Sequence, residues 1–283
     1  MEPAKRRPLA RREWSDVIGD AAAKLGPRAA FRVLQGGWQV GRVLTGRRAQ
    51  VRTRFLDFSM FGGDFEASAD AVRRRIADVF DIEEHEPGRT MITVTALDYR
   101  KVDILPPYLE VAVTVPVRYL GEPGDLVLEM PVTTAEARWA GAMAYGFPKI
   151  LAGIRIGHEG GERACHVTAG GLHVLTLHVQ PVLSELRVPL ALHHFNVRDD
   201  EQIVGSDFTG TGDLERSDEP AGATLELGEH PIGVGLRALS IASTSRAHFD
   251  GPRMSAVLGK GRELGIVARP SASRRAPFIG SPA

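Results

Sequence analysis

The sequence contains a single cysteine, Cys165, which can form neither an internal disulfide nor a metal site built from several cysteines. It also lacks an excess of charge of either sign, because 35 lysine and arginine residues balance 35 aspartate and glutamate residues. Binding to a nucleic-acid backbone normally requires a basic excess. Nucleic acid is therefore not an expected partner.

No stretch reaches the roughly 18 to 20 apolar residues that a membrane helix needs. Residues 1–16 are basic but lack the hydrophobic core of a signal peptide. We expect a cytoplasmic protein with no membrane partner. With 43% hydrophobic and 25% charged residues among 283, the composition is typical of a folded globular protein.

Three segments differ in composition. Residues 1–50 combine a basic arm with a helical extension, in which apolar residues repeat at helical spacing over 14–25. Residues 51–267 form the predicted main domain, and residues 268–283, rich in Pro, Ser and Arg, form a loose tail. We expect the extension to pack against a neighbouring subunit or to cap the main domain.

The main domain is predicted to be rich in strands. Ser68 can cap a helix over 69–80, and Thr133 with Glu136 has the spacing of a capping box before a helix over 134–145. A turn is predicted at 121–125. Alternating or short apolar runs predict strands at 90–99, 109–119, 126–132, 149–157, 164–169, 172–182, 223–227 and 234–243. Because these strands follow one another at hairpin spacing, the predicted fold class is α+β, mainly antiparallel β.

Lysine is scarce in this chain, with five residues among 35 basic ones, so each position is informative. Lys149 follows Gly146, Phe147 and Pro148, where glycine suits the left-handed end of a helix and proline prevents its continuation. One interpretation is a surface lysine that complements the helix dipole. The alternative is a nucleophilic amine, because an amine among apolar side chains is poorly solvated when charged.

Glu110 shares one face of its predicted strand with Ala112, Thr114 and Pro116, while valines occupy the other face. Alternation alone favours a solvent-facing carboxylate. The alternative is a carboxylate that lines a cavity walled by small residues, where it can transfer a proton.

Other candidate motifs are weak. Residues 233–238 loosely fit a dinucleotide-binding pattern, but no strand–helix–strand unit surrounds them. The chain has several histidines but no helical HExxH pattern, so no metal site is predicted. Cys165 adjoins His166, but neighbouring residues on a strand point to opposite faces, so these two cannot form a nucleophile and base pair. We therefore expect Cys165 to be a small core residue.

Four blocks of sequence, in order and at similar spacing, resemble the acetoacetate decarboxylase family: residues 103–110, 115–119, 124–125 and, above all, Gly146-Phe147-Pro148-Lys149. The resemblance covers residues 65 to 180, with a weaker match at 249–253. The lysine of this family is itself a standard example of an activated amine.

The resemblance implies a β-barrel with flanking helices, a homo-oligomer, and a small keto acid or other carbonyl compound as substrate. It implies that Lys149 forms a Schiff base and that Glu110 is an active-site carboxylate. No metal or organic cofactor is implied, because a protonated imine supplies the electron sink. Tyr108 and Phe147 are the implied substrate-binding neighbours.

The chain also departs from the family pattern. Ile150 replaces a second lysine, and Gly141-Ala142-Met143 replaces a Gly-Arg-Glu segment. Thr95 aligns with a second carboxylate and Phe58 with an arginine, so we assign Thr95, Met143 and Phe58 as substrate-binding candidates. A cavity with fewer charges suits a keto substrate larger or more apolar than acetoacetate.

Three functions remain open from the sequence. The first is a carbon–carbon lyase that decarboxylates a β-keto acid or a related keto acid. The second is an aldolase–dehydratase that uses pyruvate-like substrates in secondary metabolism and shares the same iminium. The third is a noncatalytic barrel that binds a small ligand.

Overall fold

The computed structural model describes residues 51–182, 187–198 and 201–267, together with Arg32 and Gln35. The predicted helix at 14–25 and the predicted tail at 268–283 lie outside the described residues. The division of the chain at residues 50 and 267 stays a prediction. Two β-sheets and three short helices make up the described fold.

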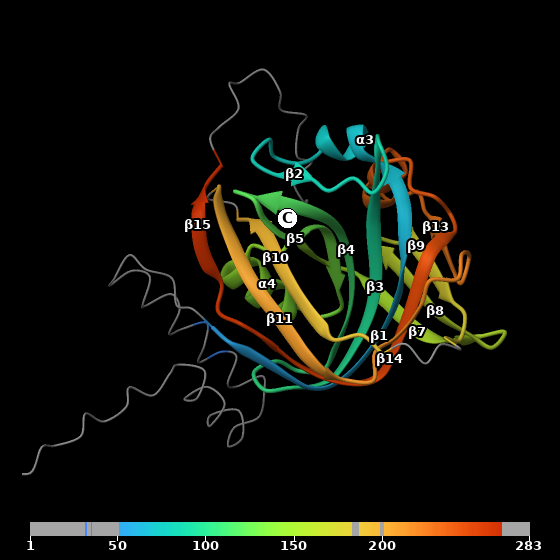
Figure 1. The fold of residues 1–283 in the computed structure, drawn as a ribbon. Helices are drawn as coiled ribbons and strands as arrows, with labels where there is room; N and C mark the ends of the chain where they lie inside the picture. The colour runs from blue at the N-terminus through green and yellow to red at the C-terminus, as the bar shows by residue number, and fades with distance from the viewer. Residues whose placement is uncertain (1–31, 33–34, 36–50, 183–186, 199–200, 268–283) are drawn as a thin grey trace, which may run out of the picture.

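The larger sheet closes into a barrel, and in Figure 1 α4 is seen behind its strands β10 and β11. Its pairings are antiparallel except where β10 runs parallel to β5 and β6 runs parallel to β5. The barrel closes because β14 pairs with both β1 and β11. Around the barrel the order is β1 (Thr53–Ser68), β3 (Arg89–Val102), β4 (Tyr108–Tyr119), β5 (Glu122–Val132), β10 (Leu190–Val197), β11 (Gln202–Gly212) and β14 (Ser245–Leu258).

Three short helices and four further short strands of the larger sheet accompany the seven barrel strands in the described fold. They are α3 (Ala69–Arg73), β2 (Asp81–Ile82), α4 (Ala135–Tyr145), β6 (Lys149–Leu151), β12 (Glu215–Ser217), α5 (Pro231–Arg237) and β15 (Arg262–Ile266). The structure thus confirms the expected mainly antiparallel barrel with flanking helices.

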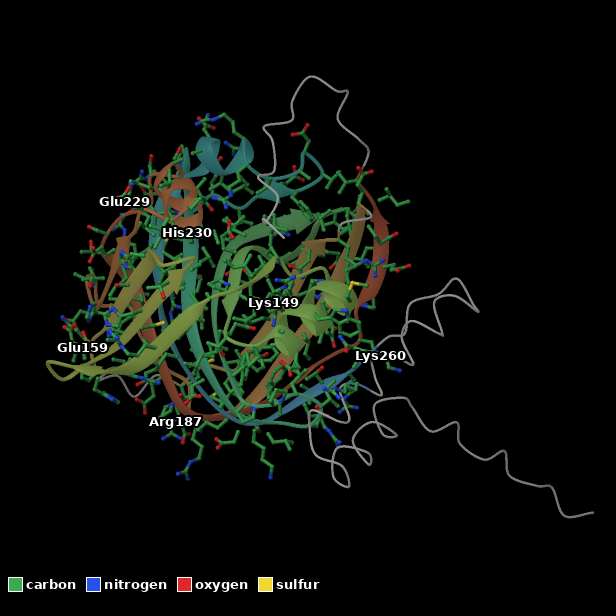
Figure 2. All side chains as sticks on the ribbon, turned by 180° about the vertical axis from the view of Figure 1, so that it is seen from behind. Lys149, Glu159, Arg187, Glu229, His230 and Lys260 are labelled. Carbon is green, nitrogen blue, oxygen red and sulfur yellow. The ribbon has the colours of Figure 1, made fainter. Side chains whose placement is uncertain are left out.

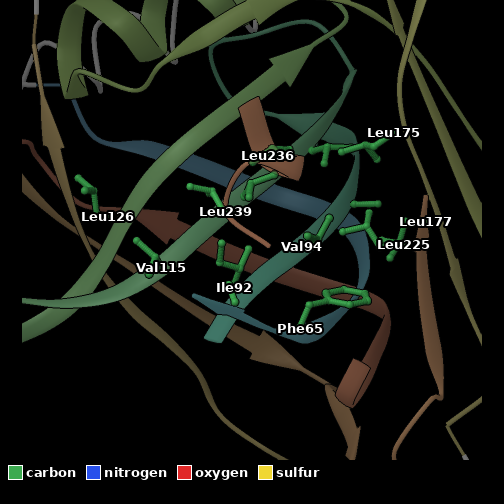
Figure 3. Packing of buried hydrophobic residues seen from close by; sticks show 14 of the residues in the cluster. Phe65, Ile92, Val94, Val115, Leu126, Leu175, Leu177, Leu225, Leu236 and Leu239 are labelled. Carbon is green, nitrogen blue, oxygen red and sulfur yellow. The ribbon is translucent and has the colours of Figure 1, made fainter. Parts of the chain in front are cut away.

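The second sheet covers part of the outer face of the barrel. Its order is β13 (Ala223–Leu227), β9 (Leu172–Val179), β8 (Glu162–Ala169) and β7 (Gly153–Glu159). Figure 3 shows the buried cluster that includes Val94 and Val115 from the barrel and Leu175 and Leu177 from the second sheet. Cys165 belongs to this cluster, and burial raises the pKa of its thiol to about 12, so the predicted core role is confirmed.

Two predicted helices have different boundaries from those expected. The first, α3, ends at Arg73 rather than near residue 80, because the chain then turns to bury Phe80 against Tyr119 and Phe195. The second, α4, begins one residue later than expected, at Ala135, because its N-cap is Thr134, whose hydroxyl accepts from the Ala137 amide. Thr133 does not cap the helix, because its hydroxyl accepts from Leu109 instead.

Three predicted strand regions need correction. The turn expected at 121–125 is shorter, since β5 already begins at Glu122. The strand expected over 149–157 is two strands in two different sheets, β6 and β7, with a break at Ala152. The strand expected over 234–243 is wrong: α5 occupies its first part, because Pro231 opens a helix and the His230 ring accepts from the Ile232 amide.

No helix within the described ranges is long and apolar enough to span a membrane.

Gly62 marks a place where two barrel strands and an aromatic ring approach closely. A Cβ atom there would lie 2.3 Å from the Val94 carbonyl oxygen and 2.6 Å from the Phe249 ring. We expect Gly62→Ala to lower the free energy of unfolding by about 1–3 kcal/mol, because the backbone of β3 must move. Urea unfolding measures this change.

Gly157→Ala is the matched control, because a Cβ atom at Gly157 would meet nothing within 4 Å. Equal stability of the two variants would contradict the close approach at Gly62.

Candidate active site

A conformationally restricted turn after α4 positions Lys149 at the barrel. Helix α4 ends at Gly146, whose φ of 74° lies in the left-handed region that favours glycine. The Phe147 amide donates a hydrogen bond to the Gly141 carbonyl oxygen, and Pro148 prevents the helix from continuing. Lys149 then begins β6, opposite Met130 in β5. In Figure 2, Lys149 lies toward the middle of the view, whereas Lys260 lies at the edge.

Lys149 and Glu110 form a buried ion pair. The Lys149 Nζ atom donates to Glu110 Oε2 at 2.6 Å, and both side chains are only 6% exposed. Glu110 sits on β4 with Leu97 and Val132 as its neighbours on the flanking strands. A lysine at this depth is not a surface residue at a helix end, and Glu110 does not face solvent.

Three aromatic side chains surround this pair. The Nζ atom of Lys149 lies 5.4 Å from the centroid of the Tyr108 ring and 5.6 Å from that of Phe147. Burial, together with the charge of Glu110, raises the pKa of Tyr99 and Tyr108 well above the ordinary value, so both hydroxyls stay protonated. Protonated hydroxyls can donate to a carboxylate or to a substrate oxygen.

Tyr99 was not predicted from the sequence as a site residue. It lies opposite Tyr108 in the pairing of β3 with β4, and this register was not available from the sequence.

The pair opens onto a cavity of about 250 Å³ inside the barrel. Five of the predicted site residues line it: Lys149, Glu110, Tyr108, Phe147 and Thr95. The rest of the cavity wall is mostly apolar. Its apolar residues are Phe55, Met60, Leu97, Ala112, Met130, Val188, Pro189, Leu190, Leu192, Phe208, Leu214, Phe249 and Leu258. Such a wall fits a small organic ligand.

Two predicted substrate-binding residues do not line the cavity. Phe58 is fully buried between the rings of Tyr99 and Phe208, at centroid distances of 5.4 and 6.1 Å. Register shifts on both sides of Phe58 in β1 turn it away from the lining. Met143 packs with the apolar core from α4. Alignment along the chain carries no information on such shifts.

The cavity has a second polar region, which the sequence did not reveal. Asp125, His194, Thr93, Thr114 and Arg216 line it. Burial, with the charges of Asp64 and Glu83, raises the pKa of Asp125 to about 6, and burial lowers the pKa of His194 to about 4.

Asp125 and His194 come from strands that are distant in sequence but adjacent in the barrel, where they are opposite each other across β5 and β10. Asp125 lay in the predicted turn, and His194 was one of many histidines. Neither position carried a distinguishing local signal.

Within the part of the chain that the structure describes, no group of three or more His, Cys, Asp or Glu side chains could hold a metal ion. Two of the histidines on the second sheet have a hydrogen-bonding role instead. His166 and His173 each contact Thr176 Oγ1, at 3.2 and 2.9 Å, and His166 also contacts Glu159.

The ionisation of Asp125 makes stability depend on pH. Because its pKa in the folded chain is about 6 rather than 3.8, Asp125 favours folding below about pH 4 and loses this contribution as the pH rises through 6. Asp125→Asn cannot ionise. We therefore expect it to be more stable than the wild type by up to about 3 kcal/mol at pH 8, and to gain little at pH 4.

Urea unfolding of both proteins at the two pH values measures this difference. The titration of His194 occurs in both proteins and cancels in the comparison. The same stability difference at pH 4 and pH 8 would contradict a raised pKa at Asp125.

A family model described as acetoacetate decarboxylase matches residues 43–215, which is more than half of the chain. No curated protein matches the sequence at a significant level.

Several solved structures share the fold. Acetoacetate decarboxylase from Legionella pneumophila is 19% identical, with 76% of this chain and 88% of that one covered and a TM-score of 0.58. A second acetoacetate decarboxylase structure is 17% identical, with 77% and 91% covered and a TM-score of 0.60. The enduracididine biosynthesis enzyme MppR, complexed with pyruvate, is 15% identical, with 77% and 91% covered and a TM-score of 0.57. Since the family model spans the strands that carry Lys149 and Glu110, the chain belongs to the acetoacetate decarboxylase family.

Proposed function

We propose that the protein is a carbon–carbon lyase that acts on a β-keto acid or a related keto acid through a Schiff base on Lys149. One observation carries the proposal: the buried pair of Lys149 and Glu110, 2.6 Å apart, lies in the wall of the cavity. A primary amine at that place can reach a carbonyl carbon, and the carboxylate beside it can accept or return a proton.

The first half of the reaction forms the iminium. Transfer of the shared proton from Lys149 to Glu110 leaves a neutral amine, whose lone pair attacks the carbonyl carbon of the substrate. Glu110 passes this proton, and then a second proton taken from the nitrogen of the addition intermediate, to the carbonyl oxygen, which leaves as water. The product is a positively charged iminium that links the substrate carbon to Nζ of Lys149.

The second half breaks the carbon–carbon bond. The electron pair of the bond to the carboxylate moves into the iminium, carbon dioxide leaves, and an enamine remains. Protonation of the enamine carbon and hydrolysis of the new iminium release the ketone and restore Lys149. The nitrogen cation is the electron acceptor in this scheme, so the chemistry requires no added oxidant or reductant.

An aldolase–dehydratase reaction is the second candidate. Here a proton, rather than carbon dioxide, leaves the carbon next to the iminium, and the enamine attacks an aldehyde before water is lost. Thr95 favours this alternative, because an uncharged hydroxyl lines the cavity where the family pattern places a second carboxylate. One structural neighbour, MppR, was solved with pyruvate and also with a condensation product of pyruvate and an aldehyde.

We propose further that the protein works in the cytoplasm as a homo-oligomer on a small carbonyl compound, as membership in the family suggests.

Borohydride trapping tests the role of Lys149. Incubation with acetoacetate, pyruvate or longer keto acids, followed by reduction and mass spectrometry, should place the adduct on Lys149 alone among the five lysines. Lys149→Arg keeps the positive charge but cannot form an imine, so we expect no adduct.

Lys101→Arg is the matched control, because Lys101 is exposed on β3 and the adduct should persist. The keto acid that gives the most adduct indicates whether decarboxylase or aldolase activity should be assayed next. A folded protein that gives no adduct with any of these compounds would contradict the proposal and would favour a noncatalytic ligand-binding barrel.

The role of Glu110 is tested by Glu110→Gln, which keeps the shape of the side chain but removes the proton acceptor. We expect the rate of adduct formation to fall by about 100-fold or more, the usual scale for loss of a general acid–base group. Borohydride is added to samples taken at successive times, and the amount of adduct in each sample gives this rate. Glu226→Gln, at an exposed position on β13, should leave it unchanged. A Glu110→Gln variant with the wild-type rate would remove Glu110 from the mechanism.

A further inference from the structure

The cavity extends well beyond the reactive pair. The spacing of residues along strand β4 gives the length of the cavity, because Glu110 and Thr114 both line it and are four residues apart. At about 3.3 Å per strand residue, their backbones are roughly 13 Å apart. Thr114 lies opposite Thr93 on β3, and Asp125 on β5 lies opposite Pro116, two residues further along. A three- or four-carbon keto acid bound to Lys149 does not reach this second region.

The charges that line the cavity are compensated, with one exception. Lys149 pairs with Glu110, and Arg216 pairs with Asp64 at 2.8 Å. Asp64 also accepts a hydrogen bond from Thr93 Oγ1 at 2.6 Å. Asp125 forms no ion pair or side-chain hydrogen bond with any residue in the described ranges. Its pKa of about 6 leaves it ionised at neutral pH, so its negative charge faces the cavity without a direct ion-pair partner in the described ranges, although the charge of His193 lowers this pKa.

His194 is a second unsatisfied group at the same place. It is only 8% exposed, and its Nδ1 atom has no hydrogen-bond partner among the described residues. Its lowered pKa keeps the ring neutral at neutral pH, so one ring nitrogen can accept a hydrogen bond. The Phe147 ring lies between the two regions, with its centroid 5.6 Å from Lys149 Nζ and 6.0 Å from the His194 ring centroid.

Buried polar groups in folded proteins normally have partners within the protein. An uncompensated carboxylate and an unpartnered imidazole nitrogen on adjacent strands cost stability and hold no other element in place. Groups of this kind are typical of ligand-binding sites. An anionic acceptor beside a neutral acceptor is complementary to a cation that carries N–H donors.

We propose that Asp125 and His194 form a distal subsite that binds a protonated amine at the far end of an elongated carbonyl substrate, while the carbonyl carbon lies at Lys149. The carbonyl end of this inference rests on the proposed function. The amine end rests on the cavity lining alone. Thr114 provides a hydroxyl between the two ends.

Two series of methyl ketones test the subsite. One series ends in a dimethylammonium group and the other in an isopropyl group of the same shape, with matched chain lengths. A tertiary amine cannot form an imine with its own ketone. Dissociation constants from calorimetry report binding without chemistry, and borohydride trapping at Lys149 reports the iminium.

At the best chain length, we expect the wild type to bind the ammonium ketone about tenfold or more tightly than its isopropyl counterpart, the usual scale for a charged hydrogen bond. Asp125→Asn should abolish this preference. Asp125→Ser is a second variant of smaller volume. Asp98→Asn, on β3 outside the cavity lining, should keep the preference.

The outcomes distinguish failure of the subsite from failure of the proposed function. Trapping of both series without any preference in the wild type, or a preference that survives in both Asp125 variants, overturns the subsite and leaves the Schiff base standing. A preference that depends on Asp125, in a protein that forms no adduct, supports the subsite and overturns the Schiff base. Absence of binding by every ketone overturns both.

Discussion

The buried contact between Lys149 and Glu110 is the constraint on which the rest of the structure depends. Removing two charges from water costs several kcal/mol for each ion, and only a short contact with further polar neighbours recovers that cost. The 2.6 Å contact therefore requires accurate placement of two separate elements, β4 and the turn after α4. The closed barrel holds both elements, and Tyr99 and Tyr108 bring their hydroxyls to the same carboxylate.

Strand β4 shows how the fold separates stability from chemistry. Its valines point outward into the apolar cluster shared with the second sheet, while Glu110, Ala112 and Thr114 point into the cavity. The outer face supplies hydrophobic stabilisation, which allows the inner face to keep groups that disfavour folding, such as an ionised Asp125. The second sheet thus matters to the site although none of its residues lines the cavity.

Local features of the site were readable from the sequence, whereas features that depend on strand pairing were not. Gly146 and Pro148 predict the turn that presents Lys149, because each restricts the backbone by itself. Alternation assigned Glu110 to solvent, because a cavity inside a barrel and bulk water give the same polar pattern along one strand. Phe58 was misplaced by register shifts that leave no mark in a linear alignment. Asp125 and His194 meet only through the parallel pairing of β5 with β10, which joins distant parts of the chain.

The closure of the barrel through β14 also sets an order for folding. Leu258, near the end of the described chain, is the partner of Thr53 at its beginning and of Phe208 on β11. Pairings between such distant segments form late and slowly, because a long loop must be ordered first. A ribosome-bound chain that has not yet released β14 has an open sheet, in which water still reaches Lys149. The amine therefore acquires its dry surroundings only when synthesis of the barrel is complete.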